Sequence, residues 1–174
     1  MASLAATASP IKESTSAATK GGGESVTKRL QQELMGLMMQ PSDGVSAFPS
    51  EDNMFLWSAS LSGPLSTAYT GHTYKLTISF PPDYPYSPPT LKFTTGIWHP
   101  NIDLHGNICL DILKEKWSPA YNVRTVLVSL RSLLGEPNND SPLNVQAAGM
   151  WEDQVRFKEI AKNKWEEEMR KEGA

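Results

Sequence analysis

The 174-residue sequence predicts an α+β domain, and the order of its apolar patterns is the main reason. A helical pattern comes first, alternating strand patterns follow, and helical patterns return in the last third of the chain. The length fits one domain with some residues to spare. A domain of about 150 residues buries roughly 70% of the surface that its unfolded chain exposes, so we expect a substantial core.

Charge and cysteine content narrow the class of protein. The net charge is −3 and no long basic run occurs, which argues against nucleic acid as the main partner. A single cysteine rules out an internal disulfide and suits a reducing compartment. No apolar run approaches the ~20 residues that span a membrane, and the N-terminus lacks the apolar core of a signal peptide. We expect a protein of the cytoplasm and nucleus.

Residues 1–24 are rich in Ala, Ser, Thr and Gly, which predicts a flexible tail ahead of a domain at 25–174. Ser25 or Thr27 is the expected N-cap of the first helix, and Pro41 lies beyond its end. Residues spaced three and four apart give this helix one apolar stripe, made of Val26, Leu30, Leu34, Leu37 and Met38.

Alternating apolar residues predict three strands in the middle of the chain. They are Phe55, Trp57, Ala59 and Leu61; Tyr74, Leu76, Ile78 and Phe80; and Leu91 with Phe93. Between the last two lies Pro81–Pro89, where five prolines in nine residues predict a stiff projecting loop. Its tyrosines, Tyr84 and Tyr86, either pack inward or present a rigid aromatic surface.

Three helices are expected after the strands. An apolar stripe from Val123 to Leu134 marks the first, with Gly135 as its C-cap. Ser141 followed by a proline predicts the start of a second helix. Asp153 is the expected cap of a last helix that runs to about residue 168.

Cys109 is the candidate nucleophile, and the residues alone leave its chemistry open. A cysteine hydrolase would need a histidine base, for which His99 and His105 are the nearest in sequence. A structural role is the favoured interpretation of each histidine. Exchange of an acyl group between thiols needs less of a base, and the side-chain amide of Asn101 is a possible oxyanion donor. The alternative for Asn101 is a turn residue that bonds its own backbone.

The motifs around Cys109 closely resemble those of ubiquitin-conjugating enzymes. H-P-N is followed eight residues later by the cysteine in N-I-C-L-D-I-L, then by W-S-P-A, and Y-P-x-x-P-P lies upstream. The likeness covers roughly residues 27–168 and implies an N-terminal helix, a four-stranded antiparallel meander, the cysteine segment and three helices. It is closest to the cell-cycle class that works with the anaphase-promoting complex, through K-R-L-Q-Q-E-L-M-G-L-M-M, L-G-E-P-N-N-D-S-P-L-N and the N-terminal extension.

The resemblance implies a role for each central residue. Cys109 would accept ubiquitin from an activating enzyme as a thioester, and pass it to a substrate lysine with a RING-type ligase. Asn101 would stabilise the oxyanion or the adjacent loop, while His99 and Pro100 would be structural. The activating enzyme would use the ATP; neither a cofactor nor a metal site is implied.

The resemblance also implies binding surfaces. Lys28 and Arg29 would contact the activating enzyme and the ligase, although their alternative is a solvated helix face. Tyr86 and Ser118, Pro119 and Ala120 would form the ligase-facing loops. Val128 and Ser132 would contact bound ubiquitin, with core packing as the alternative for Val128.

One position departs from the family pattern. Many members carry an acid just before the Pro-Leu that follows the long helix, where this chain has Ser141 with Asp140 beside it. A lysine of ordinary pKa is neutral in only about one molecule in 2,500 at pH 7, so the acceptor must lose a proton. A serine hydroxyl is not a base, and assistance by Asp140 or by the substrate stays open. A non-catalytic member of the same fold, whose cysteine never carries ubiquitin, is the remaining alternative.

Overall fold

The computed structural model describes residues 21–41 and 44–174, and it confirms the predicted α+β class. Helix α1 spans Gly21–Met39 and precedes strands β1 (Val45–Pro49), β2 (Leu56–Ser62), β3 (Thr73–Ser79) and β4 (Thr90–Phe93). A short 3-10 helix, η1 (Asp111–Leu113), follows, and then α2 (Val123–Gly135), α3 (Val145–Met150) and α4 (Gln154–Glu172). Most of the predicted tail, residues 1–20, lies outside the described residues.

The four strands form an antiparallel meander in the order β1-β2-β3-β4. Trp57 of β2 lies opposite Ile78 of β3, and Ile78 lies opposite Leu91 of β4, so the predicted apolar positions share one buried face. The alternation pattern did not reveal β1, which only the family resemblance implied. This strand has five residues and ends in a proline, so its pattern is too short to stand out.

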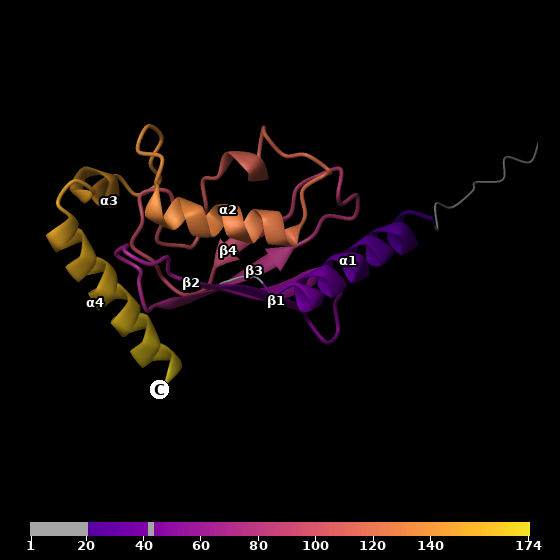
Figure 1. Ribbon diagram of the computed structural model, residues 1–174, viewed down its shortest axis with the longest axis horizontal. Coiled ribbons are helices and arrows are strands. Elements are labelled where there is room, and N and C mark those ends of the chain that lie inside the picture. Colours follow the sequence, from indigo (N-terminus) through magenta and orange to yellow (C-terminus); the bar gives the residue numbers. More distant parts are fainter. Residues whose placement is uncertain (1–20, 42–43) are drawn as a thin grey trace, which may run out of the picture.

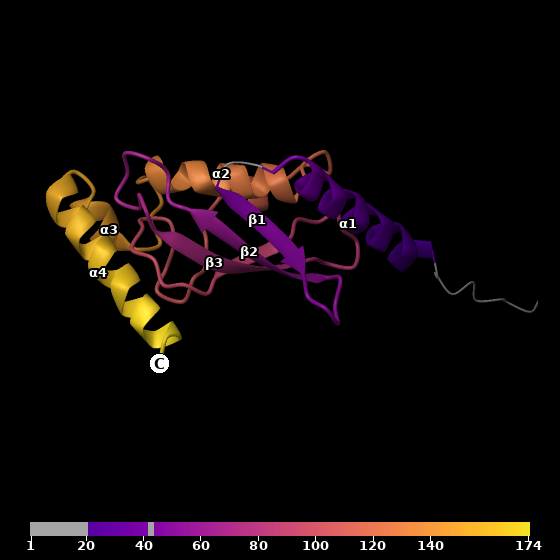
Figure 2. The same ribbon diagram turned by 60° about the horizontal axis from the view of Figure 1, so that its bottom comes forward.

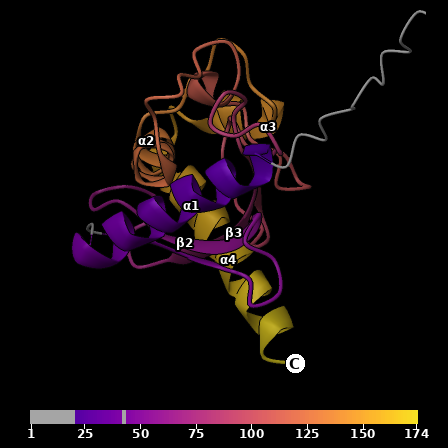
Figure 3. The same ribbon diagram turned by 90° about the vertical axis from the view of Figure 1, so that its right-hand side faces the viewer.

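Helix α2 supplies the largest helical share of the core. It runs along one side of the sheet, with α1 at one end of the molecule and α3 and α4 at the other (Figures 1 and 2). A view from the α1 end shows α2 beside the strands and α4 behind them (Figure 3). The predicted stripe of α2 is buried: Val123, Val126, Leu127, Leu130, Leu133 and Leu134. None of the helices in the described residues is long and apolar enough to cross a membrane.

Two predicted helix starts are wrong. Helix α1 begins at Gly21, so the predicted caps Ser25 and Thr27 lie within the helix. Val26 and Leu30 pack into the core and stabilise the helix on both sides of Thr27, so neither predicted cap marks its start. Helix α3 begins at Val145 rather than after Ser141, for a reason given below. The last helix starts as predicted, because the Asp153 side chain accepts a hydrogen bond from the Arg156 N–H.

Candidate active site

Cys109 lies in an extended segment held against the His99–Asn101 turn. Its backbone N–H donates to the Asn101 carbonyl at 2.9 Å. Ile102 and Ile108 form an isolated antiparallel bridge that joins the same two segments. The cysteine is half-buried, so its thiol is supported from below and still accessible. An inert cysteine in the core would be enclosed, and this one is not.

The turn between these segments depends on Gly106. Its φ is +88°, a conformation that side chains disfavour. A Cβ atom at this position would lie 2.1 Å from the Phe93 carbonyl oxygen, which is shorter than any allowed contact. The Gly106 carbonyl in turn accepts a hydrogen bond from the Phe93 N–H at 2.9 Å, which anchors the cysteine segment to the end of β4.

His99 is enclosed and has no free nitrogen. Its Nε2 lies 2.8 Å from the Leu133 carbonyl oxygen, and its Nδ1 accepts the Asn101 N–H at 3.0 Å. A carbonyl only accepts, so Nε2 carries the proton and the ring is neutral. Burial lowers the pKa of His99 to about 4, against the opposing effect of the backbone carbonyl. His99 therefore cannot serve Cys109 as a base, which removes it from the hydrolase hypothesis.

His105, the other candidate base, is exposed at the tip of the turn. Its backbone N–H donates to the Asp103 carboxylate at 2.8 Å. Among the described residues, no hydrogen bond joins its ring to Cys109. The arrangement of nucleophile, base and orienting group that a cysteine hydrolase requires is thus not assembled at this site.

The Asn101 side chain binds the backbone of a distant residue. Its Nδ2 donates to the Asn138 carbonyl at 2.6 Å, and its Oδ1 accepts the Asn138 N–H at 2.8 Å. Asn101 is 1% exposed whereas Asn138 is exposed, so a buried amide holds a loop at the surface. The amide holds the loop after α2 next to the cysteine segment. Asn138 lies in a run of polar residues and carried no sequence signal of this role.

Pro100 completes the attachment and explains where α3 starts. Its carbonyl accepts hydrogen bonds from the N–H groups of Leu143 and Asn144, at 2.9 and 3.0 Å. The Asn144 side chain then caps α3 by accepting the Ala147 N–H at 3.0 Å. The predicted cap at Ser141 is wrong because the chain first crosses to Pro100 before it turns into the helix. We call His99, Pro100, Asn101 and the backbone that they bind the Asn101 cluster.

Asp140 and Ser141 lie at the open edge of this loop. Both residues are exposed, and the Asp140 N–H donates to the Asn138 side chain at 3.0 Å. Within the described parts of the chain, neither side chain makes a hydrogen bond or ion pair. Both are therefore free to meet an incoming group.

Lys114 contacts the thiol, although the sequence reasoning did not single it out. Its Nζ lies 3.8 Å from the Cys109 Sγ, within reach of a hydrogen bond to sulfur. The short η1 helix between the two residues turns the chain back so that this approach is possible. The only sequence signal was a cation five residues after the cysteine. That spacing brings the two side chains together only because the η1 turn lies between them.

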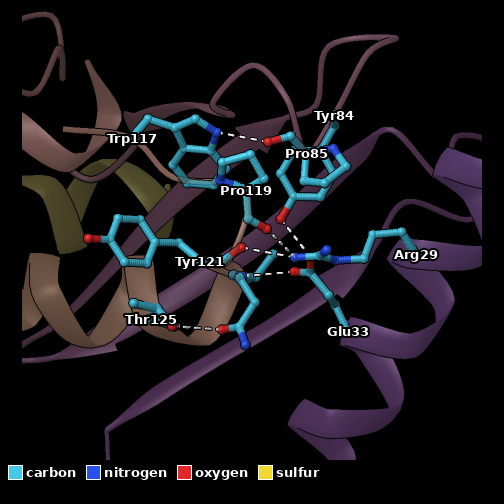
Figure 4. Close-up of polar contacts among 10 residues, drawn as sticks. Arg29, Glu33, Tyr84, Pro85, Trp117, Pro119, Tyr121 and Thr125 are labelled. Atoms are coloured by element: carbon cyan, nitrogen blue, oxygen red, sulfur yellow. Dashed lines mark hydrogen bonds and ion pairs between the residues drawn. The ribbon is translucent and has the colours of Figure 1, made fainter. Parts of the chain in front are cut away.

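A second polar cluster lies where α1 meets the loops before β4 and α2. The Glu33 carboxylate accepts from the Tyr84 hydroxyl at 2.6 Å, the Arg29 Nε at 2.8 Å and the Val123 N–H at 2.8 Å (Figure 4). Its side chain is only 6% exposed. Burial and the negative charge of Glu33 raise the pKa of Tyr84 far above its usual range. We call these residues the Glu33 cluster.

Arg29 lies inside this cluster rather than on a solvated helix face. Its guanidinium donates to the carbonyls of Pro119 and Tyr121, at 3.2 and 3.0 Å (Figure 4). The neighbouring Trp117 donates its indole N–H to the Pro85 carbonyl at 2.9 Å. Arg29 and Trp117 therefore shape two loops that are far apart in the sequence.

The predicted contact residues near these loops lie at the surface. Tyr86 is 79% exposed, whereas its neighbour Tyr84 is buried, so both alternatives for the tyrosines of the proline loop occur. Lys28, Pro119 and Ala120 are exposed, and Ser118 is half-buried with its hydroxyl accepting the Ala120 N–H at 3.2 Å.

On α2, Val128 is 44% exposed, so the core-packing alternative for this residue is wrong. Ser132, one turn further along, is also exposed and donates its hydroxyl to the Val128 carbonyl at 3.1 Å. The two residues share an open face of the helix, opposite the buried stripe.

Comparison with known proteins agrees with this fold. Residues 29–165 match the family model described as ubiquitin-conjugating enzyme. The chain is also 54% identical, over 158 residues, to the ubiquitin-conjugating enzyme E2-20 kDa of Schizosaccharomyces pombe, and the match covers 90% of each chain. The chain belongs to the ubiquitin-conjugating enzyme family. It is therefore an enzyme of ubiquitin conjugation, whose partners are ubiquitin, an activating enzyme and a ligase.

Proposed function

We propose that Cys109 carries ubiquitin as a thioester and passes it to a substrate lysine. The observation that carries this proposal is the half-exposed thiol above a turn whose polar groups are bonded internally. In charging, the Cys109 sulfur attacks the thioester on the activating enzyme, and the thiol of that enzyme leaves. In transfer, the lysine nitrogen attacks the carbonyl carbon, the new C–N bond forms and the Cys109 thiolate leaves.

In this proposal Asn101 acts on the transfer step by positioning the loop. Both functional groups of its amide are bonded to Asn138, which favours loop stabilisation over direct binding of the oxyanion. The loop carries Asp140 and Ser141, which would surround the acceptor lysine. Their exposed side chains can accept hydrogen bonds from an amine. The approach of ubiquitin would remove water from the lysine amine, which favours its neutral form.

In the binding surfaces, too, some residues would contact the partner and others would hold the loops in place. Tyr86, Pro119 and Ala120 would form the ligase contact, with Ser118 supporting the loop and Lys28 at its border. Arg29 would support the ligase-facing loop rather than contact the ligase, because its guanidinium donates to the carbonyls of this loop. Val128 and Ser132 would contact the ubiquitin carried by Cys109. An exposed valine beside a hydroxyl suits a protein partner with a small apolar patch.

The ligase that we propose is the anaphase-promoting complex, acting in cell division in the cytoplasm and nucleus. The support for this finer class is the sequence likeness around α1 and after α2, together with the N-terminal extension. The charged enzyme should ubiquitinate a mitotic substrate with this complex much faster than with an unrelated RING ligase. Equal rates with both ligases would refute the cell-cycle assignment and leave the family unaffected.

A non-reducing gel tests the thioester directly. The chain is mixed with activating enzyme, ATP and ubiquitin, and we expect an adduct that a thiol reagent removes. Cys109→Ala should abolish the adduct, and Cys109→Ser should give an oxyester that resists the thiol reagent. An unmodified chain that never forms the adduct would instead be a binding module of the same fold.

A further inference from the structure

We propose that Lys114 is a further catalytic residue, whose ammonium group stabilises the Cys109 thiolate as it leaves during transfer. This inference rests on the proposed thioester at Cys109. It starts from the contact of 3.8 Å between the Lys114 Nζ and the Cys109 Sγ. No other described residue donates a side-chain hydrogen bond to this sulfur.

The backbone around Lys114 holds its side chain near the sulfur. The Leu113 N–H donates to the Leu110 carbonyl at 3.1 Å, and the Lys114 N–H donates to the Asp111 carbonyl at 3.0 Å. The Lys114 carbonyl then accepts the Trp117 N–H at 3.2 Å. Three consecutive turn bonds thus set the position of the Lys114 Cα, and only the flexible stem remains to be ordered.

Neither Asp111 nor the adjacent Glu115 forms an ion pair with Lys114 in the described residues. The Asp111 carboxylate pairs with Lys116 at 3.2 Å, and its other oxygen accepts the Ile112 N–H at 2.8 Å. Among the described residues, Lys114 makes no ion pair. Its ammonium is therefore available to the sulfur, while Lys116, two residues away, is occupied by Asp111.

A positive charge at this position favours the transfer step. The amine nitrogen forms a bond to the thioester carbon, and the C–S bond breaks with its electron pair passing to Sγ. The sulfur changes from a neutral thioester atom to an anion, so a nearby ammonium interacts more strongly with the product than with the reactant. The amine proton leaves to solvent or to the groups at the loop edge, and Lys114 keeps its own proton throughout.

The position of Lys114 also bears on the acceptor. A second cation close to an amine disfavours the protonated form of that amine. Lys114 therefore opposes binding of a lysine ammonium and favours the neutral amine that reacts. A neutral nucleophile avoids this opposing effect, so hydroxylamine isolates the action of Lys114 on the leaving sulfur.

Single-turnover discharge of the charged full-length chain tests the proposal. Charging is completed and stopped first, and hydroxylamine is then added at low and at high salt. At ~0.05 M salt we expect Lys114→Gln to discharge about three- to fivefold more slowly, the size expected for an exposed charge contact. At ~0.5 M salt the difference should shrink, because an exposed charge is screened.

Two matched variants separate charge from structure. Lys114→Arg keeps the cation and should discharge like the unmodified chain at both salt concentrations. Lys158→Gln removes an exposed lysine of α4 that does not contact the sulfur, and it should also be unaffected.

The proposal is overturned if Lys114→Arg is as slow as Lys114→Gln, if the loss does not depend on salt, or if Lys114→Gln discharges normally. In each of these cases, a normal thiol-sensitive adduct in every variant would show that the proposed thioester at Cys109 is unaffected. Failure of the thioester itself would appear earlier, as a missing adduct in the unmodified chain.

Discussion

The Glu33 cluster and the Asn101 cluster do similar work with different chemistry. Each cluster forms a tie, meaning a set of hydrogen bonds that joins segments distant in sequence. The two ties lie at opposite ends of α2. Glu33 accepts the Val123 N–H at the start of that helix, and His99 donates to the Leu133 carbonyl near its end. The first tie is charged and partly open, since the Arg29 side chain is 30% exposed. The second is neutral and closed, because Asn101 is 1% exposed and His99 is 0% exposed.

The difference follows from the cost of burying charge. An ionised group needs an opposite charge and several hydrogen bonds before it can leave water, and Glu33 has both. The side chains of the Asn101 cluster are enclosed beneath Cys109. Burying an amide and a neutral imidazole is less unfavourable there than burying a charge. The ionisable groups closest to the sulfur, such as Lys114, are left at the exposed edge. There they can respond to substrate without destabilising the fold.

Breaking the charged tie should cost the most stability. Glu33→Ala leaves the buried Tyr84 hydroxyl and the Val123 N–H without partners, and we expect the free energy of unfolding to fall by about 3–4 kcal/mol. Urea unfolding measures this loss. Glu136→Ala removes an exposed acid at the other end of α2 and should stay within about 0.5 kcal/mol. Equal effects of the two changes would show that the Glu33 cluster is not a tie.

The neutral tie should make the free energy of unfolding depend on pH. The folded protein holds the pKa of His99 at about 4, below the ordinary value of about 6.5 in the unfolded chain. Between these values the unfolded chain binds a proton that the folded protein does not. The contribution of His99 is therefore complete above pH 6.5, and about 3 kcal/mol is lost as the pH falls to 4.

Urea unfolding at several values between pH 4 and 7.5 measures this dependence. His99→Gln should remove the part of the slope due to the imidazole, whereas His105→Gln should keep it because that residue is exposed. Carboxylates also titrate near the lower limit, so the difference between variants is the quantity to compare. Matching slopes for His99→Gln and the unmodified chain would contradict the neutral tie.

Removing the amide of the neutral tie should affect both stability and chemistry. Asn101→Ala removes two hydrogen bonds and leaves the space of a buried amide empty, which should cost about 2–3 kcal/mol. The freed loop should slow single-turnover transfer to lysine by at least about tenfold, since positioning is lost. Asn107→Ala is the control, because Asn107 bonds Asp103 at the exposed turn. It should cost less than about 1 kcal/mol.

The sequence predicted the elements better than the ties between them. The stripe of α2, three of the four strands and the Asp153 cap could be read from local spacing, because each depends on residues a few positions apart. The pairing of Asn101 with Asn138 spans 37 residues, and that of Glu33 with Val123 spans 90. No periodicity reports such contacts. The misplaced start of α3 has the same origin, since Pro100 decides where that helix begins.

The candidate site was predicted in part for a related reason. Family motifs pointed to Cys109, Asn101 and His99, which the fold brings together. Lys114 was missed because its approach to the sulfur depends on the three-residue η1 helix, which has no strong pattern. Arg29 was assigned to a surface, but its long side chain reaches back to the carbonyls of Pro119 and Tyr121.

The smallest effect on stability is expected between the two ties, at Val128. Its side chain is 44% exposed and Val126 on the same helix is 1% exposed. Val128→Ala should change the free energy of unfolding by less than about 0.5 kcal/mol, whereas Val126→Ala should cost roughly 2 kcal/mol. If Val128 contacts ubiquitin, its truncation should still slow discharge about two- to fivefold, the size expected for losing part of an apolar contact. Urea unfolding and single-turnover discharge on the same samples separate the two effects. Loss of stability at Val128 without loss of rate would place this residue among the structural positions of α2.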